Sequence, residues 1–111
     1  ENGRLVIMFC GFEGSPQIVR LHGTGEVITQ DDEEFEPLAA HFPPHPGIRS
    51  FVRLKVPRVS DSCGYGVPLM DFCEPRDTLR TWSQNKGPDR LRAYQQEKNT
   101  TSIDGLPALD P

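Results

Sequence analysis

The chain has 111 residues, of which 35% are hydrophobic, and it contains 10 glycines and 11 prolines. With so few hydrophobic residues the chain cannot form a large hydrophobic core of its own. We therefore expect residues 1–111 to form one domain that completes its core with another segment or subunit. A net charge of −4 argues against general binding to nucleic acid or anionic membranes, and no apolar run reaches the about 18 residues that a membrane span needs.

The first elements of the chain have the patterns of β-strands. Residues 4–12 (RLVIMFCGF) are apolar at successive positions, which predicts a strand covered on both faces. A turn is expected at residues 13–16, and residues 17–29 alternate as a second strand of a hairpin. Because Gly23 and Gly25 lie on its apolar face, we expect a bend or a close backbone approach there.

The middle of the chain predicts a short helix followed by a third strand. Asp31 and Glu34 have the spacing of a capping box, so the helix is placed from there to about His41. Prolines then end it, and residues 51–59 alternate as a strand in which Pro57 predicts an edge position or a strand end.

The C-terminal third predicts two helices and a tail. Residues 60–72 (SDSCGYGVPLMDF) have no clear periodicity, one helix is expected from Pro75 to Gly87, and another from Pro88 to Asn99. Residues 102–111 are expected to form a loose tail. The patterns together predict an α+β domain, mainly β, built around an antiparallel sheet.

Three widely spaced cysteines, Cys10, Cys63 and Cys73, form no Cys-x-x-Cys pair. This excludes a zinc ribbon or a thioredoxin-type motif, and a small secreted disulfide scaffold would use more cysteines in even number. We therefore expect reduced thiols in a cytoplasmic protein. Cys63 is interpreted as a small buried residue, because no base or orienting acid can be placed beside it.

Several side chains outside any established motif could bind a ligand. His41 and His45 are four residues apart, but the intervening prolines exclude a continuous helix, so we expect no metal site and favour surface or ligand-contacting roles. Arg20, Arg49 and Arg53 could meet a phosphate or carboxylate through the guanidinium group, although arginines on strand faces are more often solvated.

Four segments carry a resemblance to a known family: IMFCGFEGSPQIVRLHGTGEV, HFPPHPGIRS, SCGYGVPLMDF and EKNTTSIDGLP. They resemble a poorly characterised subgroup of the pyridoxamine 5'-phosphate oxidase-like proteins. The resemblance implies an antiparallel split β-barrel that forms a homodimer and binds FMN in grooves between its subunits. It also implies that about half of the barrel, with much of the FMN phosphate site, is missing before Glu1.

The resemblance also suggests site residues. By position, His41, His45 and Arg49 fall where the parent enzymes contact substrate, whereas Ile18 stands where those enzymes have a flavin-contacting Gln. The segment SCGYGVP has no parent counterpart. The small residues of this segment could let backbone amides approach a flat cofactor. Alternatively, the segment could be only a structural corner, a turn that leads the chain into its C-terminal helices. The residues concerned are Ser62, Cys63, Gly64, Tyr65 and Gly66.

These implications give three functional hypotheses. The first is an FMN-dependent oxidoreductase that acts on a small-molecule substrate of unknown identity. The second is a non-catalytic module that binds a flavin, a deazaflavin or a tetrapyrrole such as haem. The third is an inactive dimerising fragment whose strand edges are covered by a partner.

Overall fold

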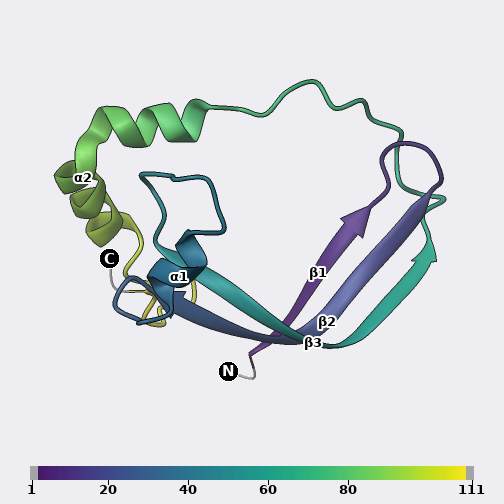
Figure 1. The fold of residues 1–111 in the computed structure, drawn as a ribbon, viewed down its shortest axis with the longest axis horizontal. Helices are drawn as coiled ribbons and strands as arrows, with labels where there is room; N and C mark the ends of the chain where they lie inside the picture. The colour runs from purple at the N-terminus through teal and green to yellow at the C-terminus, as the bar shows by residue number, and fades with distance from the viewer. Residues whose placement is uncertain (1–2, 110–111) are drawn as a thin grey trace. The chain divides into compact units, whose positions relative to one another are not determined.

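The computed structural model describes residues 3–109, which fall into two compact units. The first unit holds the chain up to Asp32 and from Ser50 to Glu74, and the second holds Glu33–Arg49 and the chain from Pro75 onward. Strands β1 (Arg4–Cys10), β2 (Gln17–Thr29) and β3 (Ser50–Cys63) lie in the first unit. Helices α1 (Phe35–Ala39) and α2 (Thr78–Lys98) lie in the second (Figure 1). The α+β class, mainly β, is therefore confirmed.

The three strands form one antiparallel sheet in the order β1-β2-β3. β1 and β2 form the predicted hairpin, and Gly14 in its turn has a φ of 66°, a backbone conformation that glycine adopts easily. β2 is central and β3 is an edge strand, which agrees with the position expected for Pro57.

A β-bulge interrupts the pairing of β2 with β3 at Gly23. His22 pairs with Arg58 and Thr24 pairs with Lys55, so two residues of β3 lie opposite this one glycine. A Cβ atom at position 23 would lie 2.0 Å from the Lys55 carbonyl oxygen. The close backbone approach predicted for the paired glycines is therefore confirmed at Gly23.

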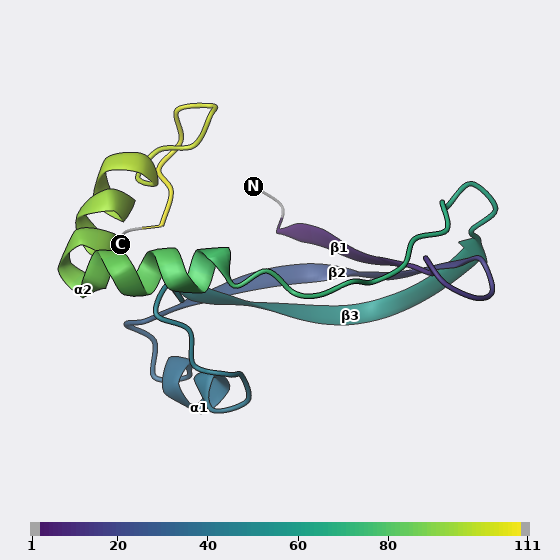
Figure 2. The same cartoon turned by 90° about the horizontal axis from the view of Figure 1, so that it is seen from above.

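Two features of the sheet differ from the sequence prediction. β3 continues to Cys63, because residues 60–63 pair with residues 17–20 of β2 although they lack a recognisable alternation. In addition, β1 is exposed on both faces rather than covered: Met8 on one face and Phe9 on the other are 56% and 55% exposed. The sheet is seen as a thin layer in Figure 2.

The N-cap of helix α1 lies three residues later than predicted. Glu34 is its N-cap and forms no side-chain cap hydrogen bond, so the predicted capping box with Asp31 is wrong. The neighbouring Asp32 instead closes a turn, since its carboxylate accepts hydrogen bonds from the Thr29 backbone N–H (2.6 Å) and hydroxyl (2.9 Å). The backbone bond, followed by the hydroxyl bond, lowers the pKa of Asp32 below its ordinary value of 3.8.

Helix α2 consists of two helical segments joined at a kink, as the sequence predicted. Gly87 has φ 72° and ψ 165°, a combination that is essentially restricted to glycine, and Pro88 begins the second segment (Figure 1). The first segment starts at Thr78, three residues after Pro75. Trp82 and Tyr94, from either side of the kink, make an edge-to-face contact with ring centroids 5.1 Å apart.

Few residues of either unit are deeply buried. Among the hydrophobic residues that the structure describes, those classed as buried are Ile28, Phe35 and Leu91. Within residues 3–109, no helix combines the length and apolar character needed to cross a lipid bilayer. The expected tail begins with a hydrogen-bonded turn, in which the Ser102 N–H donates to the Leu106 carbonyl (2.9 Å), while its residues 110–111 lie outside the described part.

Candidate functional site

One face of the sheet gathers basic and hydroxyl side chains from β2 and β3. In the strand register Arg20 lies opposite Ser60, and His22 lies opposite Arg58. Residues directly opposite each other project from the same face of a sheet, and so do every second residues along a strand. We define the polar face as the following residues: Arg20, His22, Arg58, Ser60 and Ser62.

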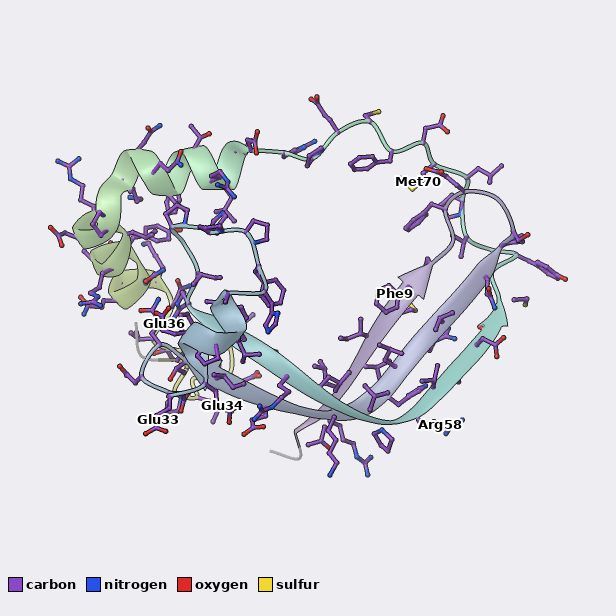
Figure 3. All side chains as sticks on the ribbon, in the orientation of Figure 1. Phe9, Glu33, Glu34, Glu36, Arg58 and Met70 are labelled. Carbon is purple, nitrogen blue, oxygen red and sulfur yellow. The ribbon has the colours of Figure 1, made fainter. Side chains whose placement is uncertain are left out.

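Two side-chain contacts connect the strands across the polar face. Nη1 of Arg20 donates a hydrogen bond to Oγ of Ser62 at 2.9 Å, and Nε2 of His22 lies 2.8 Å from Oγ of Ser60. Arg20 and His22 are half-buried, whereas Arg58 is exposed on β3 (labelled in Figure 3). The sequence had singled out Arg20 and Ser62, but His22, Arg58 and Ser60 were missed because only the strand register brings them together.

The polar face can bind an anion but has no complete nucleophilic machinery. A His22–Ser60 pair would need a third group to orient the imidazole, and the other members of the polar face are two arginines and a serine. Arginine presents a planar set of N–H donors that matches a carboxylate or phosphate.

The residues predicted to approach a cofactor lie at the end of β3 and in the turn after it. Ser62 and Cys63 end the strand, and Cys63 is exposed, so the expectation that it is buried is wrong. The Gly64 N–H donates to the Pro16 carbonyl at 3.0 Å, which ties this turn to the β1–β2 turn. A Cβ atom at position 64 would lie 2.7 Å from the Gln17 backbone nitrogen, so Gly64 acts as a tightly packed corner.

Tyr65 and Gly66, which follow this corner, are exposed to solvent. The Tyr65 side chain is 85% exposed, and a Cβ atom built on Gly66 meets nothing within 4 Å. The corner interpretation therefore fits Gly64, while these two residues leave room for a flat ligand.

A surface cavity of about 470 Å³ lies in the first unit, between the β1–β2 turn and the segment that follows β3. The Met70 N–H donates to the Phe12 carbonyl at 3.1 Å and holds the two segments together (Met70 is labelled in Figure 3). The sequence did not indicate this cavity, because its two walls are more than fifty residues apart. Its lining consists of the following residues: Phe12, Glu13, Gly14, Leu69, Met70 and Asp71.

The residues predicted to contact substrate lie in the second unit, in and after the turn that ends α1. His41 is exposed, and its backbone N–H donates to the Leu38 carbonyl at 3.0 Å. His45 is half-buried, and its Nδ1 accepts a hydrogen bond from the Gly47 N–H at 3.0 Å. In the neutral ring the proton is then on Nε2, which is available as a donor.

Arg49 and Ser83, in the same unit, both have a buried polar atom without a hydrogen-bond partner. Nη2 of Arg49 donates to the Leu109 carbonyl at 3.2 Å, but its Nε is buried and unpartnered. The Ser83 residue is 2% exposed and its Oγ is likewise unpartnered. A Cβ atom at Gly47 would lie 2.9 Å from this oxygen, so the turn packs closely on Ser83 and a larger residue would require the Ser83 side chain to move.

The structure thus places the predicted site residues in two groups. Ser62 is joined by Arg20 on the sheet of the first unit, and the other cofactor candidates follow it in the chain. His41, His45 and Arg49 belong to one loop of the second unit. Among the described residues, no group of three or more His, Cys, Asp or Glu side chains is arranged to hold a metal ion.

Comparison with known proteins gives one significant relative in the curated set. It is the pyridoxamine 5'-phosphate oxidase family protein ustO of Aspergillus flavus, which is 35% identical in an alignment that spans 98% of this chain and 50% of the relative. No family model and no solved structure matches significantly. The chain spans about half the length of this relative. The identity over nearly its whole length shows that the chain is homologous to a pyridoxamine 5'-phosphate oxidase family protein.

Proposed function

We propose that this chain is part of an FMN-dependent oxidoreductase with a split β-barrel fold, whose homodimer binds the flavin between its subunits. The observation that carries the proposal is the 35% identity over 98% of the chain to a pyridoxamine 5'-phosphate oxidase family protein. The open three-stranded sheet supports it, because the apolar side chains exposed on the Phe9 face of β1 are suited to contact further strands or a partner subunit.

The described residues fit a bound FMN in three respects. Arg20 and Ser62 offer N–H and hydroxyl donors for a phosphate, and both are held in place by their mutual hydrogen bond. The Tyr65 ring is exposed and free to stack on a flat ring system. The open space above Gly66 would let backbone approach the cofactor closely.

In this proposal the flavin supplies the electron-transfer chemistry, and the protein supplies binding and orientation. His41, His45 and Arg49 remain the proposed substrate contacts. His45 would donate a hydrogen bond from Nε2, since its Nδ1 is already engaged by Gly47. Arg49 would act through the guanidinium N–H groups that its bond to the Leu109 carbonyl leaves unused, since its Nε is buried. The three free cysteines support the cytoplasmic location proposed for the enzyme.

A visible absorption spectrum tests the proposal. It is recorded on the purified chain and on a chimera in which the chain is joined to the remaining half of the Aspergillus flavus relative, before and after addition of FMN. We expect the chimera to keep a flavin spectrum through desalting and the chain alone to bind FMN more weakly or not at all. A dimeric chimera that is colourless after FMN addition and desalting contradicts the proposal.

A second candidate function is a non-catalytic module that binds a flavin or a tetrapyrrole. It is favoured by the polar face, on which the His22–Ser60 pair has no carboxylate to orient it for acid-base chemistry. Stopped-flow mixing of the reduced, flavin-loaded protein with oxygen and other acceptors separates the two. Rapid reoxidation with turnover excludes a storage role, and slow reoxidation with every acceptor favours it.

A further inference from the structure

The arginines of the polar face have no acidic partner of their own. Among the residues that the structure describes, neither Arg20 nor Arg58 forms an ion pair, and the side-chain hydrogen bond of Arg20 goes to the uncharged Ser62. By contrast, Arg53 lies on the same strand as Arg58 and forms an ion pair with Glu26 at 2.9 Å. In a chain with a net charge of −4, two unpaired arginines on adjacent strands are a local concentration of positive charge.

The strand register places the two arginines close together on one face of the sheet. Arg58 lies opposite His22, and His22 is two residues along β2 from Arg20, so the two arginines are diagonal neighbours. Diagonal positions on one face are about 7–8 Å apart, within reach of long side chains. The Ser62 hydrogen bond uses one of the five N–H donors of Arg20 and leaves the others free.

The same face of the sheet becomes apolar on β1. Val6 lies opposite His22, and Met8 lies opposite Arg20, so both project from the side that carries the polar face. Their side chains are 49% and 56% exposed. A basic area over β2 and β3 is therefore continuous with an apolar area over β1.

We propose that this face binds a ligand in which a carboxylate or phosphate is attached to an apolar body. The anionic group lies between Arg20 and Arg58, with the Ser60 hydroxyl and the His22 ring as further hydrogen-bonding groups, and the apolar body covers Val6 and Met8. The anion can belong to a substrate or to the phosphate of the proposed cofactor. Binding of an anion here does not require that flavin is the cofactor.

The test uses 1-naphthoate and 1-naphthylmethylammonium, which share an apolar body and carry opposite charges. Titration of the full-length protein, followed by calorimetry, is expected to show saturable binding of the naphthoate only. Arg20→Gln and Arg58→Gln are each expected to weaken this binding about ten-fold, since a charge-assisted hydrogen bond is lost. The matched control Arg53→Gln, whose guanidinium is engaged by Glu26, is expected to change it by less than about two-fold.

Two further titrations distinguish the source of the anion. If it is the cofactor phosphate, both variants weaken FMN binding but not riboflavin binding, and FMN-loaded protein no longer binds naphthoate. If it belongs to a substrate, FMN affinity is unchanged by the variants and FMN-loaded protein still binds naphthoate. Equal binding of the ammonium probe, or equal losses in the Arg53→Gln control and the other two variants, overturns the proposal.

Discussion

Replacement of Gly23 by alanine is expected to lower the free energy of unfolding by about 3 kcal/mol or more, among the largest effects of a single substitution. The added methyl group would lie 2.0 Å from the Lys55 carbonyl oxygen, 2.9 Å from its carbon and 3.0 Å from the Leu54 side chain. The first two atoms are backbone and cannot rotate away. β2 and β3 must then separate at the bulge, which also displaces the Arg58 and His22 positions beside it.

Gly66→Ala is the matched control for this substitution. A Cβ atom at Gly66 meets nothing within 4 Å, and Gly66 is not among the glycines with positive φ. We therefore expect a change within about 0.5 kcal/mol. Urea unfolding followed by circular dichroism measures both variants. Equal unfolding midpoints for the two proteins would show that the strands are not in close contact at Gly23.

The parts of the fold that were predicted from the sequence have local signals. The bounds of β2 agree with the predicted residues 17–29, because alternation within the strand and turn residues before it are both encoded in neighbouring positions. The break of α2 at Gly87 was predicted for the same reason, since Gly followed by Pro ends one helix and begins the next.

The features that were missed depend on contacts between distant residues. Residues 60–63 are strand only because they pair with β2 residues forty or more positions earlier, and the polar face exists only in that register. The misplaced helix cap is a local exception. Asp31 was chosen as the cap, but its neighbour Asp32 accepts hydrogen bonds from Thr29, three residues earlier, and the helix starts later. Burial of Cys63 was expected because no base or orienting acid could be placed beside it, whereas Cys63 is exposed at the end of β3.

In the full-length protein, Phe9→Asp is expected to lower the free energy of unfolding by roughly 3 kcal/mol and to reduce the number of associated subunits. β1 is an edge strand among the described strands. Phe9, which is labelled in Figure 3, lies on this strand and is 55% exposed. The proposed split barrel covers this side chain with further strands or with a partner subunit. An aspartate there would place a carboxylate without a partner in an apolar contact.

Ile103→Asp is the control, because Ile103 is 101% exposed in the turn near the C-terminus and its replacement is expected to change stability by less than about 0.5 kcal/mol. Size-exclusion chromatography with light scattering counts the subunits, and urea unfolding measures the stability of both variants. If the Phe9→Asp protein keeps the subunit number and unfolding midpoint of the Ile103→Asp protein, β1 is uncovered in the native protein. This result would exclude the dimeric barrel. The barrel can form only if position 9 is covered by other apolar side chains, and a carboxylate that costs no stability there must be exposed to water.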